Sequence, residues 1–164
     1  IEHQLKRAAT GAADTWKKQT AIKPVLDSIL NAMSKVYRDK DIIFTHAVKD
    51  KDYFLGDKTD LLELLGNLID NACKACRSQV DIQVIQKRNL TIAISDDGPG
   101  VPVDKRESLL TRGTRLDTYE SGHGVGMAIV SDLVKSYHGN LTILDADTLG
   151  GAKFILEFNY NDKK

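Results

Sequence analysis

The sequence has no charge excess of either sign and no long hydrophobic run. Its 164 residues contain 23 lysines and arginines and 23 aspartates and glutamates, so only a local basic patch would attract nucleic acid or a membrane surface. The longest apolar stretch, residues 61–69, is interrupted by Glu63 and Asn67 and is far shorter than the roughly 20 residues of a membrane-spanning helix. With 41% hydrophobic and 28% charged residues, the composition indicates one globular domain with at most a small appendage.

Cysteine is scarce as well. Cys73 and Cys76 form a lone C-x-x-C inside a helical pattern, and no second pair or suitably spaced histidine accompanies them, which argues against a zinc site. The spacing puts both on one face of the helix. Two small buried thiols in a reducing compartment are favoured over redox chemistry.

The first residues include neither an initiator methionine nor a signal peptide. We therefore expect the chain to be part of a longer protein, whose localisation is determined by sequence outside it. Residues 1–18 hold few large apolar side chains and are expected to be the end of a helix from a preceding module. The main domain is then expected over residues 19–164.

Hydrophobic periodicity predicts three helices and several strands in the main domain. The helices are expected over residues 24–38, from a cap at Asp57 or Thr59 to about 76, and over 125–137. The strands are expected over residues 42–48, 53–55, 80–84, 90–94, 141–144 and 154–158. The charged stretch between Pro102 and Ser121 has no sustained period and is predicted to be a long functional or mobile loop. This order predicts a two-layer α/β (α+β) sandwich, with helices on one face of a mixed, mostly antiparallel sheet.

A row of polar residues runs along the second predicted helix. Glu63, Asn67 and Asn71 recur every four residues, and Lys74 continues the same face. The row is either the solvated face of an amphipathic helix or a site, because an amide oxygen is a good ligand for Mg²⁺ and a lysine can take up phosphate charge. Asparagine gains nothing on an exposed helix, which weakens the first reading.

Two glycine-rich stretches follow. In D96-D-G-P-G100, at the end of a predicted strand, Asp96 either begins a tight turn or accepts a hydrogen bond from an exocyclic amine, with the glycines letting a flat ring approach. In S121-G-H-G-V-G-M127 three glycines alternate and open a helix. That stretch is either a glycine-rich turn or a loop around a phosphate, since the first NH groups of a helix are unpaired donors.

The order and spacing of the three motifs resemble the asparagine box and the two glycine boxes of the GHKL (Bergerat) ATP-binding fold, over residues 22–158. The resemblance implies about five strands with three helices on one face. Members that hydrolyse ATP with water carry a glutamate four residues before the metal-binding asparagine, and this chain has Asn67 there, with Glu63 a turn too early. The motif is instead similar to that of sensor histidine kinases.

The resemblance implies roles for the residues of the three motifs. Asn71 would coordinate Mg²⁺, and Asn67 and Lys74 would approach the phosphates of ATP. Asp96 would bind the adenine amine, with two glycines lining that pocket: Gly98 and Gly100. The backbone NH groups of the last motif would meet the triphosphate, at Gly122, Gly124 and Gly126.

The long loop would form a lid over the nucleotide. Arg112, Arg115 and His123 would stabilise phosphoryl charge there, although solvated surface charge is an equal alternative for the two arginines. The resemblance gives the catalytic positions to Asn67, Lys74 and Arg115. The chain departs from the family at Ala75, where an aromatic residue often stacks on adenine, and in residues 109–115, which lack the phenylalanines of many lids.

A phosphoacceptor histidine is missing. None of the four histidines has a proline about five residues further on, as the family's acceptor box does: His3, His46, His123 and His138. The resemblance thus implies that ATP phosphorylates a separate dimerisation domain within a homodimer, for transfer to a response regulator, and that the chain is the cytoplasmic domain of a bacterial inner-membrane sensor. The alternatives are a GHKL ATPase clamp, a regulatory nucleotide-binding module, and glycine motifs that are only turns.

Overall fold

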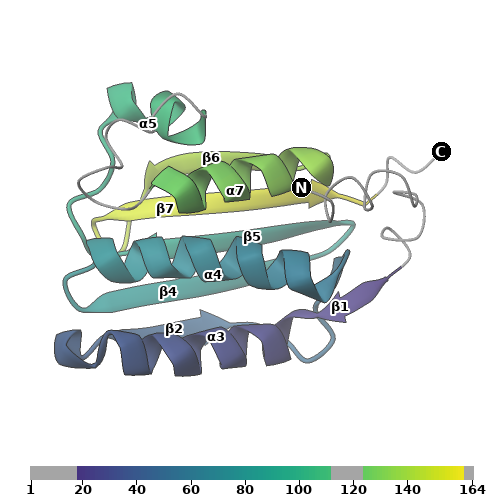
Figure 1. The fold of residues 1–164 in the computed structure, drawn as a ribbon, viewed down its shortest axis with the longest axis horizontal. Coiled ribbons are helices and arrows are strands. Elements are labelled where there is room, and N and C mark those ends of the chain that lie inside the picture. Colours follow the sequence, from purple (N-terminus) through teal and green to yellow (C-terminus); the bar gives the residue numbers. More distant parts are fainter. Residues whose placement is uncertain (1–17, 112–123, 161–164) are drawn as a thin grey trace.

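A computed structural model describes residues 18–111 and 124–160 of the chain (Figure 1). Its centre is a five-stranded sheet in the order β2-β4-β5-β7-β6. Only β2 and β4 pair in parallel, and the other neighbours are antiparallel. The strands are β2 (Ile43–Ala47), β4 (Gln79–Gln86), β5 (Asn89–Asp96), β6 (Asn140–Asp145) and β7 (Ala152–Asn159).

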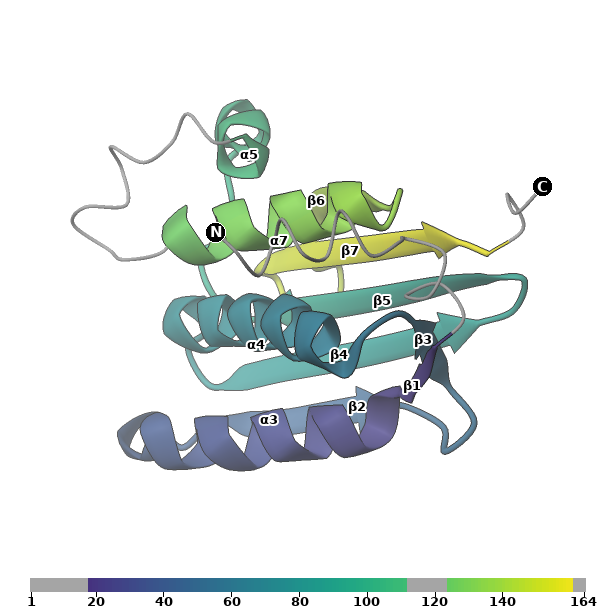
Figure 2. The ribbon, with the colours of Figure 1, turned by 45° about the vertical axis from the view of Figure 1, so that its right-hand side comes forward.

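Three helices cover one face of this sheet, as Figures 1 and 2 show. They are α3 (Ile22–Val36), α4 (Lys58–Ala75) and α7 (Gly124–Ser136). The core lies between the layers, where the leucine stripe of α4 meets the apolar side chains of β4, β5 and β7. The predicted two-layer sandwich, with its mixed, mostly antiparallel sheet, is confirmed.

Two features of its sequence explain why the helix α4 forms: a capping residue and a stripe of apolar side chains. The Asp57 side chain caps it by accepting a hydrogen bond from the Thr59 backbone NH at 3.3 Å. Its apolar positions recur at helical spacing and are fully buried, at Leu61, Leu64, Leu65, Leu68, Ile69, Ala72 and Cys73. Within the described residues, no helix is long and apolar enough to cross a membrane.

Two elements differ from the sequence prediction. The structure forms a helix, α5 (Val103–Leu110), inside the stretch predicted to be a loop, and none of its side chains is fully buried. A helix without a buried stripe has no hydrophobic period, so pattern analysis could not detect it. A small antiparallel sheet also pairs β3 (Tyr53–Leu55), which was predicted, with β1 (Gln19–Ala21), which was not. The 3₁₀ turn η1 (Arg38–Lys40) follows α3.

The end of the sheet near β1 is built from aromatic side chains. Phe54 packs on the rings of Tyr137 and Phe158, with centroids 5.0 and 5.3 Å away. The buried Tyr137 hydroxyl donates to Asp60 at 2.5 Å and accepts from the Asp57 backbone NH at 3.2 Å. These contacts join the end of α7 to the start of α4.

Candidate nucleotide-binding site

Asp96 is the last residue of β5 and lies on the helix-covered face of the sheet with Ile92 and Ile94. Its side chain is only 1% exposed. One carboxylate oxygen, Oδ1, accepts from the backbone NH groups of Gly98 at 2.9 Å and Ala152 at 3.4 Å. The other, Oδ2, is buried and has no hydrogen-bond partner among the described residues. Burial raises the pKa of this carboxyl group, and the two NH bonds oppose that shift.

Glycines let other segments approach this carboxylate. A Cβ atom on Gly98 would overlap the Ala75 carbonyl oxygen at the end of α4, and one on Gly151 would overlap Asp96 itself. Gly100 follows in the left-handed region, with φ of 78°. Gly151 is not among the predicted site residues, because its contact with Asp96 joins segments more than fifty residues apart.

The asparagine helix and the last glycine motif meet in the structure. A Cβ atom on Gly126, in the first turn of α7, would lie 2.8 Å from Asn67 Oδ1. The Asn67 amide donates to the Glu63 carbonyl oxygen at 2.7 Å and is half-buried, as is Asn71 one turn further on. The two motifs that sequence analysis assigned to the phosphates therefore touch.

Lys74 lies on the same helix, and its side chain forms an ion pair with Asp70. Its ammonium group is 3.1 Å from Asp70 Oδ2. The other oxygen of Asp70 accepts from the Tyr37 hydroxyl at 2.5 Å, so α3 helps to hold this pair. Burial, followed by the bond to Asp70, raises the pKa of Tyr37 and keeps its proton in place.

Sequence analysis missed two residues that fix the end of α4. The Lys40 ammonium group donates to three carbonyl oxygens there, those of Cys73, Lys74 and Cys76, at 2.8, 3.0 and 2.9 Å. The Asp97 carboxylate accepts from the Ser78 hydroxyl and from three backbone NH groups in the following turn, those of Arg77, Ser78 and Gln79. Partial burial opposes ionisation of Asp97, but these bonds outweigh it and lower its pKa to about 2.

The two cysteines are free and buried at the end of α4. Burial raises the pKa of both thiols, that of Cys73 to about 12, which disfavours the thiolate that redox chemistry needs. The prediction of buried thiols is confirmed.

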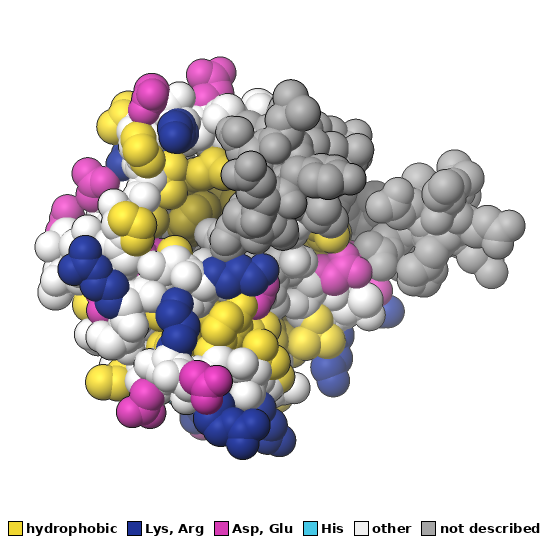
Figure 3. All heavy atoms as spheres, turned by 60° about the vertical axis from the view of Figure 1, so that its left-hand side comes forward, with side chains coloured by type: hydrophobic (Ala, Val, Ile, Leu, Met, Phe, Trp, Pro, Cys, Tyr) yellow, Lys and Arg dark blue, Asp and Glu magenta, His cyan; other side chains and the backbone are white. Residues whose placement is uncertain are grey.

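Figure 3 turns the end of the sheet that carries Asp96 towards the reader. Hydrophobic side chains line a hollow in the upper part of this face, and lysine and arginine side chains lie below it. Such a surface suits a ligand with one flat apolar part and one anionic part. Four predicted site residues lie outside the described part of the chain: Arg112, Arg115, Gly122 and His123. Gly124 begins α7.

Comparison with known proteins agrees with this geometry. Residues 56–162 match the family of histidine kinase-, DNA gyrase B- and HSP90-like ATPases. The chain is 38% identical to the sensor protein PhoQ of Escherichia coli over 160 residues, which is 96% of this chain and 33% of PhoQ. It thus spans about a third of the length of the curated relatives it matches.

Solved structures with the same fold include those of MprB and ShkA. The mycobacterial sensor histidine kinase MprB is 25% identical with a TM-score of 0.70, over 86% of this chain and 95% of that one. Full-length ShkA, solved in complex with AMPPNP, is also 25% identical, with a TM-score of 0.71 over 87% of this chain and 30% of that one. By its motifs, fold and relatives, the chain belongs to the histidine kinase-, DNA gyrase B- and HSP90-like ATPase family.

Proposed function

We propose that the chain is the ATP-binding catalytic domain of a PhoQ-like two-component sensor histidine kinase. The observation that carries the proposal is Asp96 Oδ2, a buried acceptor with no partner among the described residues. Leaving such a group without a donor costs about 1–3 kcal/mol, so a ligand that donates to it gains that free energy on binding. The exocyclic amine of adenine is such a donor.

The position of the Asp96 carboxylate determines where adenine would bind. Because Oδ1 is held by Gly98 and Ala152, Asp96 presents Oδ2 in one orientation. Gly98 and Gly100 keep the neighbouring backbone free of side chains, so a flat ring can lie against it. The related ShkA was solved in complex with AMPPNP, which supports nucleotide binding by this fold.

The phosphate end lies where α4 meets α7. Asn71 would bind Mg²⁺ through its amide oxygen, and Mg²⁺ when bound would neutralise charge on the phosphates. Asn67 would approach the phosphates beside Gly126, and Lys74 would exchange Asp70 for a phosphate oxygen. Gly122 and Gly124 would add backbone donors, and Arg112, Arg115 and His123 would add donors from the lid.

The acceptor would be a histidine on the protein's own dimerisation domain. Residues 1–18 would be the end of that domain's last helix, and residues 19–164 the catalytic domain. The whole protein would be a homodimer that phosphorylates a PhoP-like response regulator. By analogy with PhoQ, this chain would lie on the cytoplasmic side of a bacterial inner membrane.

Phosphotransfer tests this proposal. The chain, Mg²⁺ and γ-labelled ATP are mixed with the purified dimerisation domain, and acid-labile label on that domain is measured. We expect Asn71→Ala to abolish labelling and Asn31→Ala, an exposed asparagine on α3, to leave it intact. Equal labelling by wild type and Asn71→Ala would exclude the metal-binding role.

The same reaction separates the alternatives. An ATPase clamp would release labelled phosphate without an acceptor, which we do not expect because Asn67 stands where such enzymes carry glutamate. A regulatory module would bind Mg-ATP and label nothing. A chain whose glycine motifs are only turns would not bind ATP.

A further inference from the structure

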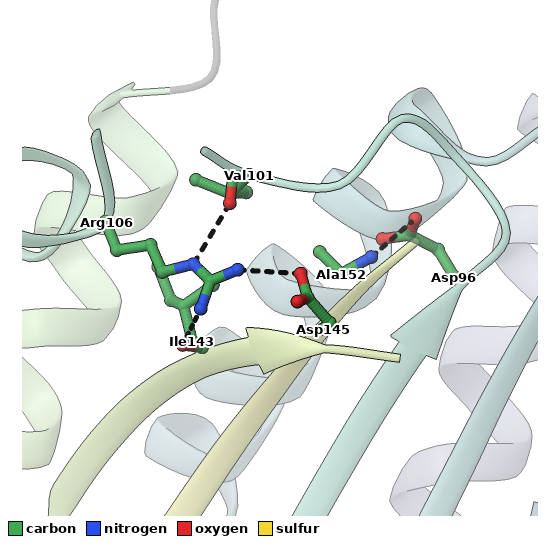
Figure 4. Close-up of polar contacts among 6 residues, drawn as sticks. All are labelled: Asp96, Val101, Arg106, Ile143, Asp145 and Ala152. Carbon is green, nitrogen blue, oxygen red and sulfur yellow. Dashed lines mark hydrogen bonds and ion pairs between the residues drawn. The ribbon is translucent and has the colours of Figure 1, made fainter. Parts of the chain in front are cut away.

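Arg106, on α5, makes three contacts with one guanidinium group, shown in Figure 4. Its Nε donates to the Val101 carbonyl oxygen at 3.0 Å, and its Nη1 donates to the Ile143 carbonyl oxygen at 3.3 Å. Its Nη2 forms an ion pair with Asp145 at 2.7 Å. The Arg106 side chain is 17% exposed and that of Asp145 is 77% exposed. The planar group thus uses all three of its nitrogen atoms.

The three acceptors lie in two segments: the loop that follows Asp96 in the sequence, and the end of β6. Val101 directly follows the loop that contains Gly98 and Gly100. Ile143 and Asp145 lie at the end of β6, and the turn after them leads to Ala152, whose NH group holds Asp96 Oδ1. Figure 4 shows Arg106 and Asp96 at the two sides of this arrangement. Arg106 itself does not contact Asp96.

The helix α5 is also anchored by Leu109 and Leu110, which are half-buried and pack against the core. None of its side chains is fully buried. At the far end of α5, the Ser131 hydroxyl of α7 donates to the Leu110 carbonyl oxygen at 3.0 Å. Val101 packs against the core as well, and Arg106 adds the directional hydrogen bonds that join its carbonyl oxygen to β6.

We propose that Arg106 is a positioning residue for the nucleotide: by joining Val101 to β6 it holds the two backbone donors that orient the Asp96 carboxylate. This inference rests on the proposed function, because it takes Asp96 as the group that binds the adenine amine. An arginine suits the task, since its rigid fork can serve three acceptors spread around one plane.

Two nucleotides and two variants test this inference. ATP carries the exocyclic amine, and purine riboside triphosphate lacks it but has the same phosphates. We expect the wild type to bind ATP at least tenfold more tightly than purine riboside triphosphate, measured by calorimetry. In Arg106→Gln the affinity for ATP should fall about tenfold while that for purine riboside triphosphate stays within about twofold. Asp145→Asn, which keeps an oxygen acceptor, should also weaken the binding of ATP selectively, but by a smaller factor.

A matched control is Arg88→Gln, which removes the same charge at the exposed turn at the opposite end of β5. It should change neither affinity. If Arg106→Gln weakens both nucleotides equally, Arg106 only stabilises the fold and the inference is wrong. If the wild type does not distinguish the two nucleotides, the role of Asp96 fails first and this inference fails with it. Binding of purine riboside triphosphate also shows that each variant is folded.

Discussion

At the end of the sheet near β1, aromatic rings pack on one another and the Tyr137 hydroxyl is hydrogen-bonded, whereas at the Asp96 end a buried carboxylate oxygen has no partner among the described residues. Both ends bury a carboxylate, since Asp60 and Asp96 are each 1% exposed. The Asp60 carboxylate accepts a hydrogen bond from the Tyr137 hydroxyl, whereas Asp96 Oδ2 accepts none from the described residues. The difference fits the proposal that the aromatic end stabilises the fold and that a ligand completes the Asp96 end.

The largest expected effect tests this difference at Asp96. Asp96→Asn keeps the oxygen that accepts from Gly98 and replaces the free acceptor by a donor. We expect the affinity for ATP to fall roughly 100-fold, because the adenine amine then faces another donor. Calorimetric titration measures this, and an unchanged affinity would show that Asp96 does not bind the base.

The stability of the same variant should move in the opposite direction. The folded-state pKa of Asp96 is raised above 3.8, so ionisation of this carboxyl destabilises the fold as pH rises through the raised value. Asp96→Asn should therefore unfold at a higher urea concentration than wild type at neutral pH. This gain should shrink as pH falls, because the wild-type carboxyl is then neutral too.

Two glycine substitutions compare crowded and open positions. Gly98→Ala would overlap the backbone of Ala75, and we expect it to lower the free energy of unfolding by about 3 kcal/mol and to weaken ATP binding. Gly66→Ala, in the middle of α4, places the added Cβ more than 4 Å from any atom outside the adjoining helical backbone, and it should raise stability by about 0.5–1 kcal/mol. Urea unfolding measures both, and a tolerated Gly98→Ala would contradict the close packing at the site.

At the aromatic end, Tyr137→Phe should affect stability alone. The variant removes the hydroxyl that donates to Asp60, and we expect the free energy of unfolding to fall by roughly 1 to 2 kcal/mol. ATP affinity should stay within about twofold. A large loss of ATP binding in a folded Tyr137→Phe would show that the two ends are coupled.

The smallest expected effect concerns how the stability of the fold decreases at acid pH. The pKa of Asp97 is lowered to about 2 in the folded chain, so its bonds stabilise the fold above the ordinary value of 3.8 and this contribution is lost as pH falls towards 2. Asp97→Asn should therefore flatten the loss of stability over this range. Unfolding curves across a pH series measure the change, and an unchanged slope would assign the acid sensitivity to other groups.

The elements with a buried stripe could be predicted from the sequence. The helix α4 and the alternating strands β4 and β5 have one apolar face each, and their periods are visible without any tertiary information. The helix α5 and the strand β1 could not, because neither buries a side chain that would set a period.

The site could be predicted only where its residues lie within short motifs. Asp96, Gly98, Asn67 and Gly126 were named from spacing, and the structure brings Asp96 beside Gly98 and Asn67 beside Gly126. The supporting residues act across large sequence separations. Lys40 reaches carbonyls more than thirty residues away, and Arg106 pairs with Asp145 across 39 residues. No local pattern records such contacts.

The contact between Arg106 and Ile143 has a further consequence for solubility. Among the described residues, the strand β6 pairs with β7 alone and so forms an edge of the sheet. Edge strands expose backbone groups to which another chain can add a strand, and natural proteins often block them with charged side chains. The guanidinium group occupies the Ile143 carbonyl oxygen, so an incoming strand in that register must first displace a charged side chain. We therefore expect the residue that joins β6 to the loop after Asp96 to hinder strand addition at this edge as well.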